Sequence, residues 1–468
     1  MAPSPLCWKD KVRSTTLSVG RCGKAVSPFL LTIILVSLLS ACVQPAVPTP
    51  SPTAVPATET AVPTLTVDNS PTPTSTTPPD NSPIALANIA TPTQTPTNTL
   101  TPTATIDLST PTASPTPNLE PITGVEQPLY AASSCSDKYP CNDDKEAWEE
   151  RIQVPEGFTD TYFAQLPGNP TSITFGPDGR LYVAVQAGTI YALNQSGTST
   201  IYATGFNTPT GIAFQPGTSN LFVSSRVVDE NVDGEAQVSI ANGRQILSGL
   251  PCCYTQLHAA NGIAFGPDGF GYVTVGARAD HGEILDGSNR QDERDPFEAS
   301  ILRFDPAGGL PELYARGFRN SYDIAWDANG DLYATDNAPD FGPPEEFHRV
   351  VPGGEHGYPW YECDACFSPP PGTEIIPPIY QFIAHSAPTG ITAYLDHQFP
   401  GYYNTLFITL WSAFPGAQKV VRFAPGGVGA SDFALGFAAP IDVTVGPHGS
   451  LYVADWATGI IFKISYTG

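Results

Sequence analysis

The stretch Leu257–Val275, LHAANGIAFGPDGFGYVTV, predicts two short β-strands joined by a tight turn. Gly262–Phe265 and Gly271–Val275 are apolar and rich in strand-forming residues. Between them, Gly266-Pro267-Asp268-Gly269 has the chemistry of a turn, because proline presets φ and glycine accepts a positive φ. The stretch is therefore expected to form a β-hairpin.

The same hairpin recurs along the chain. The other copies are SITFGPDGRLYVAV at Ser172–Val185, GIAFQPGTSNLFVSS at Gly211–Ser225, DIAWDANGDLYATD at Asp323–Asp336, DVTVGPHGSLYVAD at Asp442–Asp455 and a looser one at Gly390–Thr409. Six hairpins with strand-like pieces between them predict an all-β fold, a six-bladed β-propeller over residues 133–468. The strand-like runs Val154–Leu166 and Gly459–Ile464 are expected to pair in one blade and close the ring.

The first part of the chain, residues 1–41, has the pattern of an export signal. Basic side chains precede Phe29–Ser40, an apolar run of twelve residues that is too short to span a bilayer comfortably. The run ends in Leu-Ser-Ala-Cys42, which resembles a bacterial lipobox, so Cys42 is expected to be lipidated. This predicts a lipoprotein on the extracellular face of the cell envelope, touching the membrane only through its lipid. An ordinary secretory signal is the alternative.

Residues 42–132 consist mostly of Pro, Thr, Ser, Ala and Asn. Such a composition cannot bury a core, so a disordered linker is expected between the signal and the propeller. The formal net charge of the whole chain is −24, which disfavours nucleic acid as a partner.

The chain has nine cysteines, three of which (Cys7, Cys22 and Cys42) belong to the signal or the lipid site. The remaining six are Cys135, Cys141, Cys252, Cys253, Cys363 and Cys366. An even number in an exported domain is typical of disulfides, whose connectivity the sequence leaves open. Cys363 and Cys366 also have the spacing of zinc ligands, so a structural zinc site remains an alternative.

In a propeller, the loop that enters the first strand of each blade lies at one mouth of the central channel. The residues four positions before the six repeats are Gly168, Asn207, His258, Arg319, Ser386 and Ala438. His258 and Arg319 thus occupy equivalent positions on adjacent blades. A neutral imidazole can act as a general base, and a guanidinium can hold an anion or a developing oxyanion. The alternative is that each side chain only caps a strand or binds a backbone carbonyl.

Several motifs point to one known family. They are His258 seven residues before Phe265 of AFGPDG, the run Arg316–Asn320, the segments Asp336–Asp340, Glu345-Glu346 and Gly353–Pro359, and the stretch Ala384–Phe423. With these motifs, Val154–Tyr466 resembles the glucose/sorbosone dehydrogenase family, soluble six-bladed quinoproteins that use pyrroloquinoline quinone and calcium. The sorbosone dehydrogenase branch is the most similar.

The resemblance implies oxidation of a sugar or related alcohol, with an electron acceptor that the sequence does not identify. The base would take the hydroxyl proton while hydride passes to the quinone. Calcium would be held by backbone carbonyls, as oxygen-ligand sites allow. The residues implied are His258 and Arg319 for catalysis, Arg319, Asn320 and Lys419 for the cofactor, and Ala338 and Pro339 for calcium.

The sequence departs from the family pattern at three places, one of which is Phe206, beside Asn207, where the resemblance implies a glutamine on the second blade. Phe437–Asp442 holds no arginine where the resemblance implies a cation for the cofactor carboxylates. Ala277 stands where a carboxylate is implied, and Asp280 follows three residues later. Two functions therefore remain open: a surface-anchored quinoprotein dehydrogenase, and a non-catalytic propeller that binds carbohydrate or protein.

Overall fold

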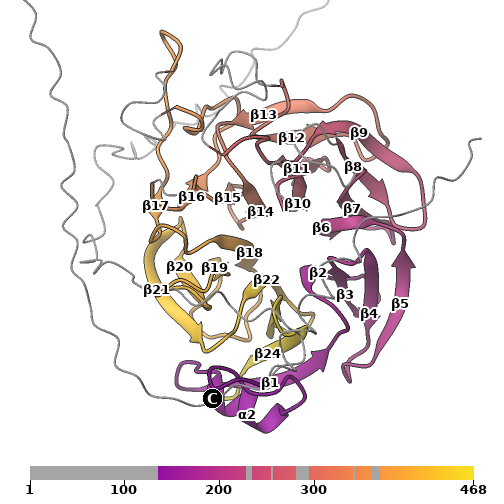
Figure 1. The fold of residues 1–468 in the computed structure, drawn as a ribbon, viewed down its shortest axis with the longest axis vertical. Helices are drawn as coiled ribbons and strands as arrows, with labels where there is room; N and C mark the ends of the chain where they lie inside the picture. The colour runs from indigo at the N-terminus through magenta and orange to yellow at the C-terminus, as the bar shows by residue number, and fades with distance from the viewer. Residues whose placement is uncertain (1–134, 228–234, 254–256, 281–294, 341–342, 361–368) are drawn as a thin grey trace, which may run out of the picture. The chain divides into compact units, whose positions relative to one another are not determined.

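The computed structural model describes residues 135–227, 235–253, 257–280, 295–340, 343–360 and 369–468. All of them belong to the second of two compact units, Leu100–Gly468. The described residues form six sheets of four strands each, arranged around a central axis (Figure 1). The predicted six-bladed propeller is confirmed. The predicted signal, Cys42, the linker and the pair Cys363 and Cys366 lie outside the described residues.

Five blades take their four strands consecutively from the chain. Blade 1 contains β2 (Pro170–Phe175), β3 (Leu181–Val185), β4 (Thr189–Leu193) and β5 (Ser199–Thr204). Blade 2 contains β6 (Asn207–Phe214), β7 (Leu221–Arg226), β8 (Glu235–Ile240) and β9 (Gln245–Pro251). Blade 3 contains β10 (Ala260–Phe265), β11 (Gly271–Val275), β12 (Ser300–Phe304) and β13 (Glu312–Arg316). Blade 4 contains β14 (Ser321–Trp326), β15 (Leu332–Asp336), β16 (Glu346–Arg349) and β17 (Tyr380–Gln381). Blade 5 contains β18 (Pro388–Tyr394), β19 (Thr405–Leu410), β20 (Lys419–Ala424) and β21 (Val428–Leu435).

Blade 6 joins the two ends of the propeller. It contains β22 (Pro440–Val445), β23 (Leu451–Asp455) and β24 (Ile460–Tyr466), and its outer strand is β1 (Phe158–Gln165). β1 pairs antiparallel with β24, from Phe158 opposite Tyr466 to Gln165 opposite Ile460, and the two strands lie side by side in Figure 1. The expected closure is confirmed. Because β1 and β24 pair with each other, each of them has at least one edge covered by a neighbouring strand.

The turn chemistry read from the sequence appears in the β10–β11 hairpin. Gly266 donates its backbone N–H to the carbonyl of Phe270 at 2.9 Å, and Gly269 has a φ of 82°. The Asp268 carboxylate accepts the Phe270 N–H at 3.2 Å. Aromatic side chains then join neighbouring blades, since the Tyr272 ring lies 5.0 Å from the Trp326 ring of blade 4. The repeat therefore sets both the hairpin and the packing between blades.

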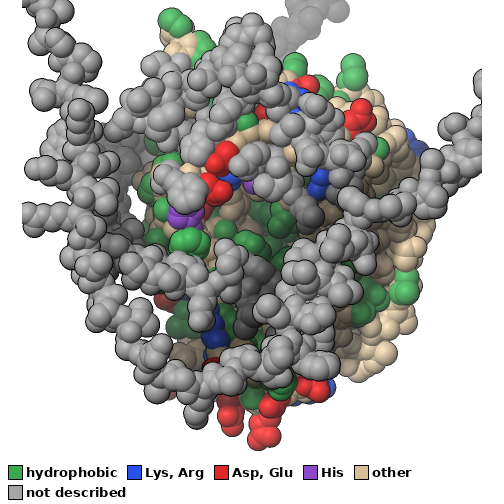
Figure 2. All heavy atoms as spheres, in the orientation of Figure 1, with side chains coloured by type: hydrophobic (Ala, Val, Ile, Leu, Met, Phe, Trp, Pro, Cys, Tyr) green, Lys and Arg blue, Asp and Glu red, His purple; other side chains and the backbone are tan. Residues whose placement is uncertain are grey.

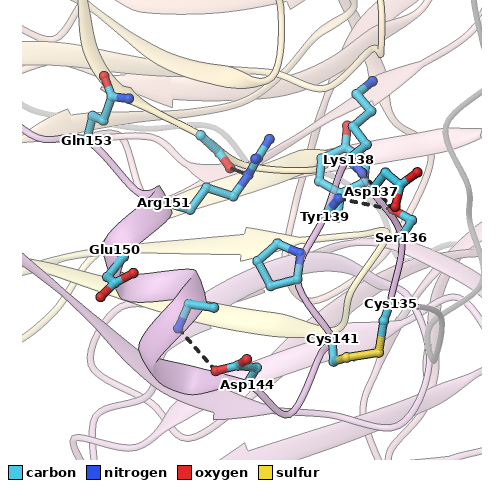
Figure 3. A pocket seen from close by; sticks show the side chains of 13 residues that line it. Cys135, Ser136, Asp137, Lys138, Tyr139, Cys141, Asp144, Glu150, Arg151 and Gln153 are labelled. Carbon is cyan, nitrogen blue, oxygen red and sulfur yellow. Dashed lines mark hydrogen bonds between the residues drawn. A yellow bond between two sulfur atoms is a disulfide. The ribbon is translucent and has the colours of Figure 1, made fainter.

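A short segment before β1 caps blade 6, which the sequence did not predict. Helix α2 (Lys145–Arg151) begins after Asp144, whose side chain accepts the Ala147 N–H at 3.2 Å. Trp148 is fully buried, with its ring 5.8 Å from that of Phe462. So short a helix is stable only through such packing. Figure 3 shows the cleft of about 700 Å³ beside it and the Cys135–Cys141 disulfide.

No helix among the described residues is both long and apolar enough to cross a membrane.

One side chain reaches across the central channel. The Tyr322 hydroxyl of blade 4 donates to the Thr171 carbonyl of blade 1 at 2.9 Å. Around it, Asp323 accepts the N–H of Ile391 at 3.0 Å, and Asp442 accepts that of Ile173 at 2.7 Å. Each carboxylate thus connects its blade to the next one. Burial raises the pKa of both groups, and the charge of Asp442 raises that of Asp323 further.

Candidate functional site

The six residues predicted at the mouth lie in register. Gly168, His258, Arg319, Ser386 and Ala438 each stand two residues before the first strand of their blade, and Asn207 begins β6. His258 and Arg319 are buried, with 6% and 5% of their surfaces exposed. Figure 2 shows one face of the molecule, with apolar side chains at its centre and acidic and histidine side chains to one side. The equivalence inferred from the repeat therefore holds in the fold.

The imidazole of His258 is held in its neutral form. Burial lowers the pKa of His258 well below its usual value, the positive charge of Arg319 lowers it further, and a hydrogen bond to the Ala277 backbone opposes both. The neighbouring Gly276 leaves no space for a side chain. A Cβ there would lie 2.7 Å from Asn320 Oδ1 and 3.4 Å from the His258 Cα. A neutral imidazole is the form that accepts a proton.

Arg319 is fixed at both its backbone and its side chain. Its N–H donates to Asp336 Oδ2 at 2.9 Å. Nη1 donates to the carbonyls of Asn337 at 3.3 Å and Ala338 at 3.0 Å, and Nη2 forms an ion pair with Asp280. The guanidinium therefore lies among one carboxylate and two carbonyl oxygens.

Asn320 is positioned by the same carboxylate. Its backbone N–H donates to Asp336 Oδ1 at 2.7 Å. Its side-chain Oδ1 accepts Asn261 Nδ2 at 2.9 Å, which connects β10 to the start of blade 4. Asp336 thus orients two consecutive residues at the mouth.

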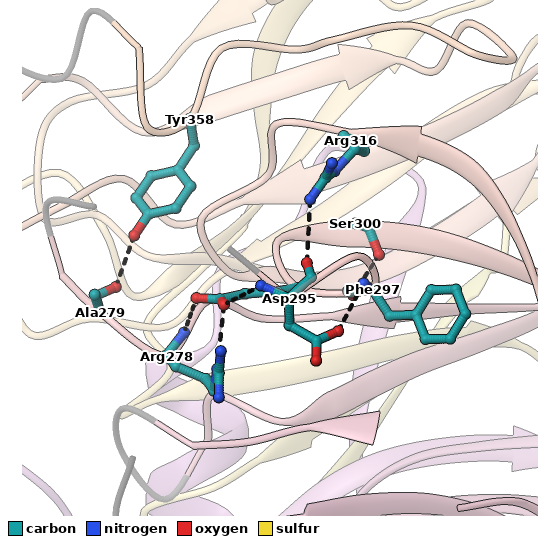
Figure 4. A network of polar contacts seen from close by, with 8 residues as sticks. Arg278, Ala279, Asp295, Phe297, Ser300, Arg316 and Tyr358 are labelled. Atoms are coloured by element: carbon teal, nitrogen blue, oxygen red, sulfur yellow. Dashed lines mark hydrogen bonds and ion pairs between the residues drawn. The ribbon is translucent and has the colours of Figure 1, made fainter. Parts of the chain in front are cut away.

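Asp280 reaches the mouth because the segment before it is anchored (Figure 4). Arg278 Nε pairs with Glu298 Oε2 at 3.1 Å, and the Arg278 N–H donates to Glu298 Oε1 at 2.8 Å. The Tyr358 hydroxyl donates to the Ala279 carbonyl at 3.0 Å. The carboxylate of Asp280, three residues after Ala277, therefore reaches the mouth and pairs with Arg319.

The loop after β15 is held by Glu345, which is 4% exposed. Glu345 Oε2 accepts the Ala338 N–H at 2.8 Å. Burial raises the pKa of Glu345 to about 7, while backbone hydrogen bonds from Ala338, Ala387 and His385 and the charge of Arg319 oppose the rise. His385 and Ala387 have φ values of 63° and 50°, a left-handed conformation that non-glycine residues adopt at a cost. One carboxylate therefore connects two loops at the mouth.

The donor set fits calcium in its chemistry. The carbonyl oxygens of Asn337 and Ala338 and the carboxylate of Asp280 converge on one cation, the Arg319 guanidinium. Calcium prefers such hard oxygen ligands. Pro339 is the next residue of the same loop. The residues of this loop that would hold a calcium ion are Ala338 and Pro339, through their backbone carbonyls.

Lys419 lies in a different setting. Its Nζ pairs with Asp432 at 2.7 Å on blade 5. Both line a cavity of about 110 Å³ together with Phe382 and Ser386. The amino group predicted to approach the cofactor is thus already paired with a carboxylate of its own blade.

A second set of mouth residues was missed by the sequence reasoning. They follow or end the second strand of each blade and are Gln186, Arg226, Gly276, Asn337, Trp411 and Trp456. Arg226 is 4% exposed and belongs to blade 2. His258, on blade 3, therefore has a blade with an arginine at the mouth on each side: Arg226 on blade 2 and Arg319 on blade 4. The same repeat alignment, extended to the end of the second strand, would have found them.

Asp336, Glu346 and His348 form a compact group whose ligand atoms lie within 4.8 Å of one another. His348 Nε2 lies 3.0 Å from Glu346 Oε2, and His348 Nδ1 lies 3.3 Å from His356 Nδ1. His356 Nε2 accepts the Val351 N–H at 3.3 Å, so the proton of His356 is on Nδ1. His356 Nδ1 then donates to His348 Nδ1, and His348 Nε2 donates to Glu346 Oε2. Burial lowers the pKa of His348 to about 3. These bonds occupy the histidine nitrogens, which favours a hydrogen-bonded support over a metal centre.

The fold and the mouth define a class: six-bladed propellers with a buried histidine–arginine pair at one end of the channel. A family model for glucose/sorbosone dehydrogenases matches residues 223–462, more than half of the chain. The chain therefore belongs to the glucose/sorbosone dehydrogenase family, which places it among oxidoreductases.

Individual relatives are more distant. An uncharacterised protein of Borreliella burgdorferi is 27% identical over 281 residues, covering 55% of this chain and 71% of that protein. The PQQ-bound aldose sugar dehydrogenase of Streptomyces coelicolor is 19% identical with a TM-score of 0.53, covering 67% of this chain and 99% of that one. The apo aldose sugar dehydrogenase of Escherichia coli is 17% identical with a TM-score of 0.52, covering 66% and 99%. At these identities the solved structures show the fold alone.

Proposed function

We propose that this protein is a quinoprotein-type oxidoreductase that oxidises a sugar or related alcohol with pyrroloquinoline quinone and calcium. The observation that carries the proposal is the neutral, buried His258 beside the fixed guanidinium of Arg319. Family membership and the PQQ-bound state of the Streptomyces relative support it.

The residues at the mouth fit the cofactor in two respects. Arg319, Asn320 and Arg226 would face the oxygens of the anionic quinone. The carbonyls of Ala338 and Pro339 would hold the calcium. When bound, the quinone would supply the hydride acceptor and calcium the polarising charge.

The chain's own residues then perform the proton chemistry. His258 takes the hydroxyl proton on its ring nitrogen, because its lowered pKa keeps the imidazole neutral before the step. The guanidinium of Arg319 stabilises negative charge that develops nearby, and Asp280 keeps that guanidinium in place. Burial of both side chains limits the access of water to them.

The decisive experiment titrates the purified protein with quinone and calcium and then assays a panel of aldoses with an artificial electron acceptor. His258→Ala should lower turnover at least ~100-fold, since loss of a general base costs about 10²–10⁴ in rate. Near-wild-type turnover of this variant would contradict the assignment. Absence of turnover in the wild type at saturating quinone and calcium would favour a non-catalytic carbohydrate-binding propeller.

The location proposed for this activity is the outer face of the cell envelope. It is supported by the lipobox-like Leu-Ser-Ala-Cys42 and by the linker composition of residues 42–132. Mass spectrometry of membrane-extracted protein should find no peptide before Cys42, and an unmodified Cys42 in secreted protein would contradict it.

A further inference from the structure

The mouth of the propeller has two chemically different halves. Blades 2 to 4 contribute charged and polar side chains, including Arg226, His258 and Arg319. Blades 5 and 6 contribute Trp411 and Trp456 at the equivalent position after the second strand. Both indoles are partly buried. The proposed proton transfer and charge stabilisation involve only the polar half.

The two tryptophans are fixed against each other and against blade 1. Their rings are 5.6 Å apart at an interplanar angle of 81°. Trp456 Nε1 donates to Gln186 Oε1 at 3.2 Å. The backbone carbonyl of Trp456 accepts a hydrogen bond from Asn169 Nδ2 at 2.8 Å. The Trp456 side chain therefore bridges three blades and has little freedom to lose when a ligand binds.

The same apolar cluster connects this wall to the catalytic base. Leu257, which precedes His258, packs into the cluster that contains Tyr322, Trp411 and Trp456. Tyr322 reaches across the channel, because its hydroxyl, on blade 4, is bound to blade 1. At blade 6, the residue that stands where blade 4 has Arg319 is the small Ala438. The mouth thus has an aromatic side and a polar side.

We propose that Trp411 and Trp456 form a stacking wall for the pyranose ring of a neutral aldose, whose hydroxyl edge faces His258. A pyranose has an apolar C–H face and a hydroxyl edge, which match the two halves of the mouth. The net charge of −24 favours a neutral sugar over a phosphorylated or acidic one. This inference rests on the proposed function and names its substrate subsite.

The test measures sugar binding without turnover. Methyl β-D-glucopyranoside is titrated into the cofactor-free, full-length protein, and binding is followed by calorimetry and intrinsic fluorescence. Trp456→Leu should weaken binding about tenfold or more, because the indole face is lost. The matched control is Trp326→Leu, at the end of β14 away from the mouth, which should bind like the wild type.

Gln186→Met provides a second variant that leaves both indoles in place and removes only the amide that holds Trp456. It should weaken binding by about threefold, and circular dichroism verifies the fold of each variant. Absence of sugar binding in the wild type, or equal binding by the Trp456 and Trp326 variants, would overturn the inference.

The outcome also separates the two proposals. Sugar binding that needs Trp456, without turnover, supports the wall and contradicts the oxidoreductase. Turnover with a KM that Trp456→Leu leaves unchanged supports the oxidoreductase and contradicts the wall.

Discussion

Asp280 and Arg319 form a buried ion pair across the boundary between blades 3 and 4, with side chains only 11% and 6% exposed. The same Asp280 oxygen accepts the N–H of Asp340 at 3.1 Å. One carboxylate therefore fixes both the guanidinium beside His258 and the loop that carries Ala338.

Asp280→Asn should lower the free energy of unfolding by ~3 kcal/mol, because it leaves a buried guanidinium without its counter-charge. Urea unfolding measures the change. Glu312→Gln is the matched control, since Glu312 pairs with Arg303 but is 72% exposed. Its effect should stay within about 1 kcal/mol. Equal effects of the two variants would show that the inner pair contributes no more than an exposed one.

Glu345→Gln should weaken calcium binding about tenfold or more, since groups that orient metal ligands typically contribute this much. The substitution removes the charge that holds the Ala338 N–H and the left-handed residues His385 and Ala387. Calorimetric titration with calcium gives the affinity. Lys419→Met, which changes the separate pair with Asp432, should leave calcium affinity unchanged. Unaltered affinity in the Glu345 variant would remove this residue from the calcium site.

The channel carboxylates Asp323 and Asp442 should contribute less to the stability of the protein as pH rises. The pKa values of these two carboxyl groups are raised in the folded state, so the folded protein binds their protons more tightly than the unfolded chain does. The contribution of these two groups to stability is fully present below the usual aspartate pKa of about 4 and is lost as pH rises through the raised values. Each proton contributes up to about 1.4 kcal/mol per pH unit within that window.

Asp442→Asn should flatten this dependence, because it removes one titrating group and the repulsion on Asp323. Urea unfolding between about pH 5 and pH 8 measures the slope, with the exposed Asp137→Asn as control. A slope equal to the wild-type one would contradict the raised pKa values.

Trp148→Ala should destabilise the protein by about 3–5 kcal/mol, the usual cost of truncating a fully buried tryptophan. The side chain connects α2 to Phe462 of the closing blade. Thermal and urea unfolding measure the effect. Ile201→Ala, at a residue that is 64% exposed, should change stability by less than about 0.5 kcal/mol. A small effect at Trp148 would mean that the cap is not part of the cooperative unit.

The blades could be predicted because their signal is local. Gly266–Gly269 sets its own turn, and the alternation of β-formers around it needs no distant partner. The register of His258 with Arg319 followed from the same repeat. The second set of mouth residues, Arg226 and Trp456 among them, was missed because the alignment was used only before the first strand.

Other features depend on contacts between residues far apart in sequence. Asp280 reaches Arg319 because Tyr358 and Glu298 anchor its segment, and no spacing rule encodes that. Lys419 meets Asp432 through the pairing of β20 with β21. Helix α2 was missed because its stability comes from packing on blade 6, with little contribution from its own short sequence.

The pairing of β1 with β24 also sets an order of assembly. Contacts between residues so far apart form late, since the entropy of closing the loop must be overcome before they contribute. During synthesis, blades 2 to 4 emerge before β23 and β24, so His258 and Arg319 can meet while the ring is still open. Trp456 follows β23, and Gln186 belongs to the first complete blade. The contact of Trp456 with Gln186 thus forms only when the last blade docks on the first, and a ring that fails to close would keep the Asp280–Arg319 pair but lack this contact.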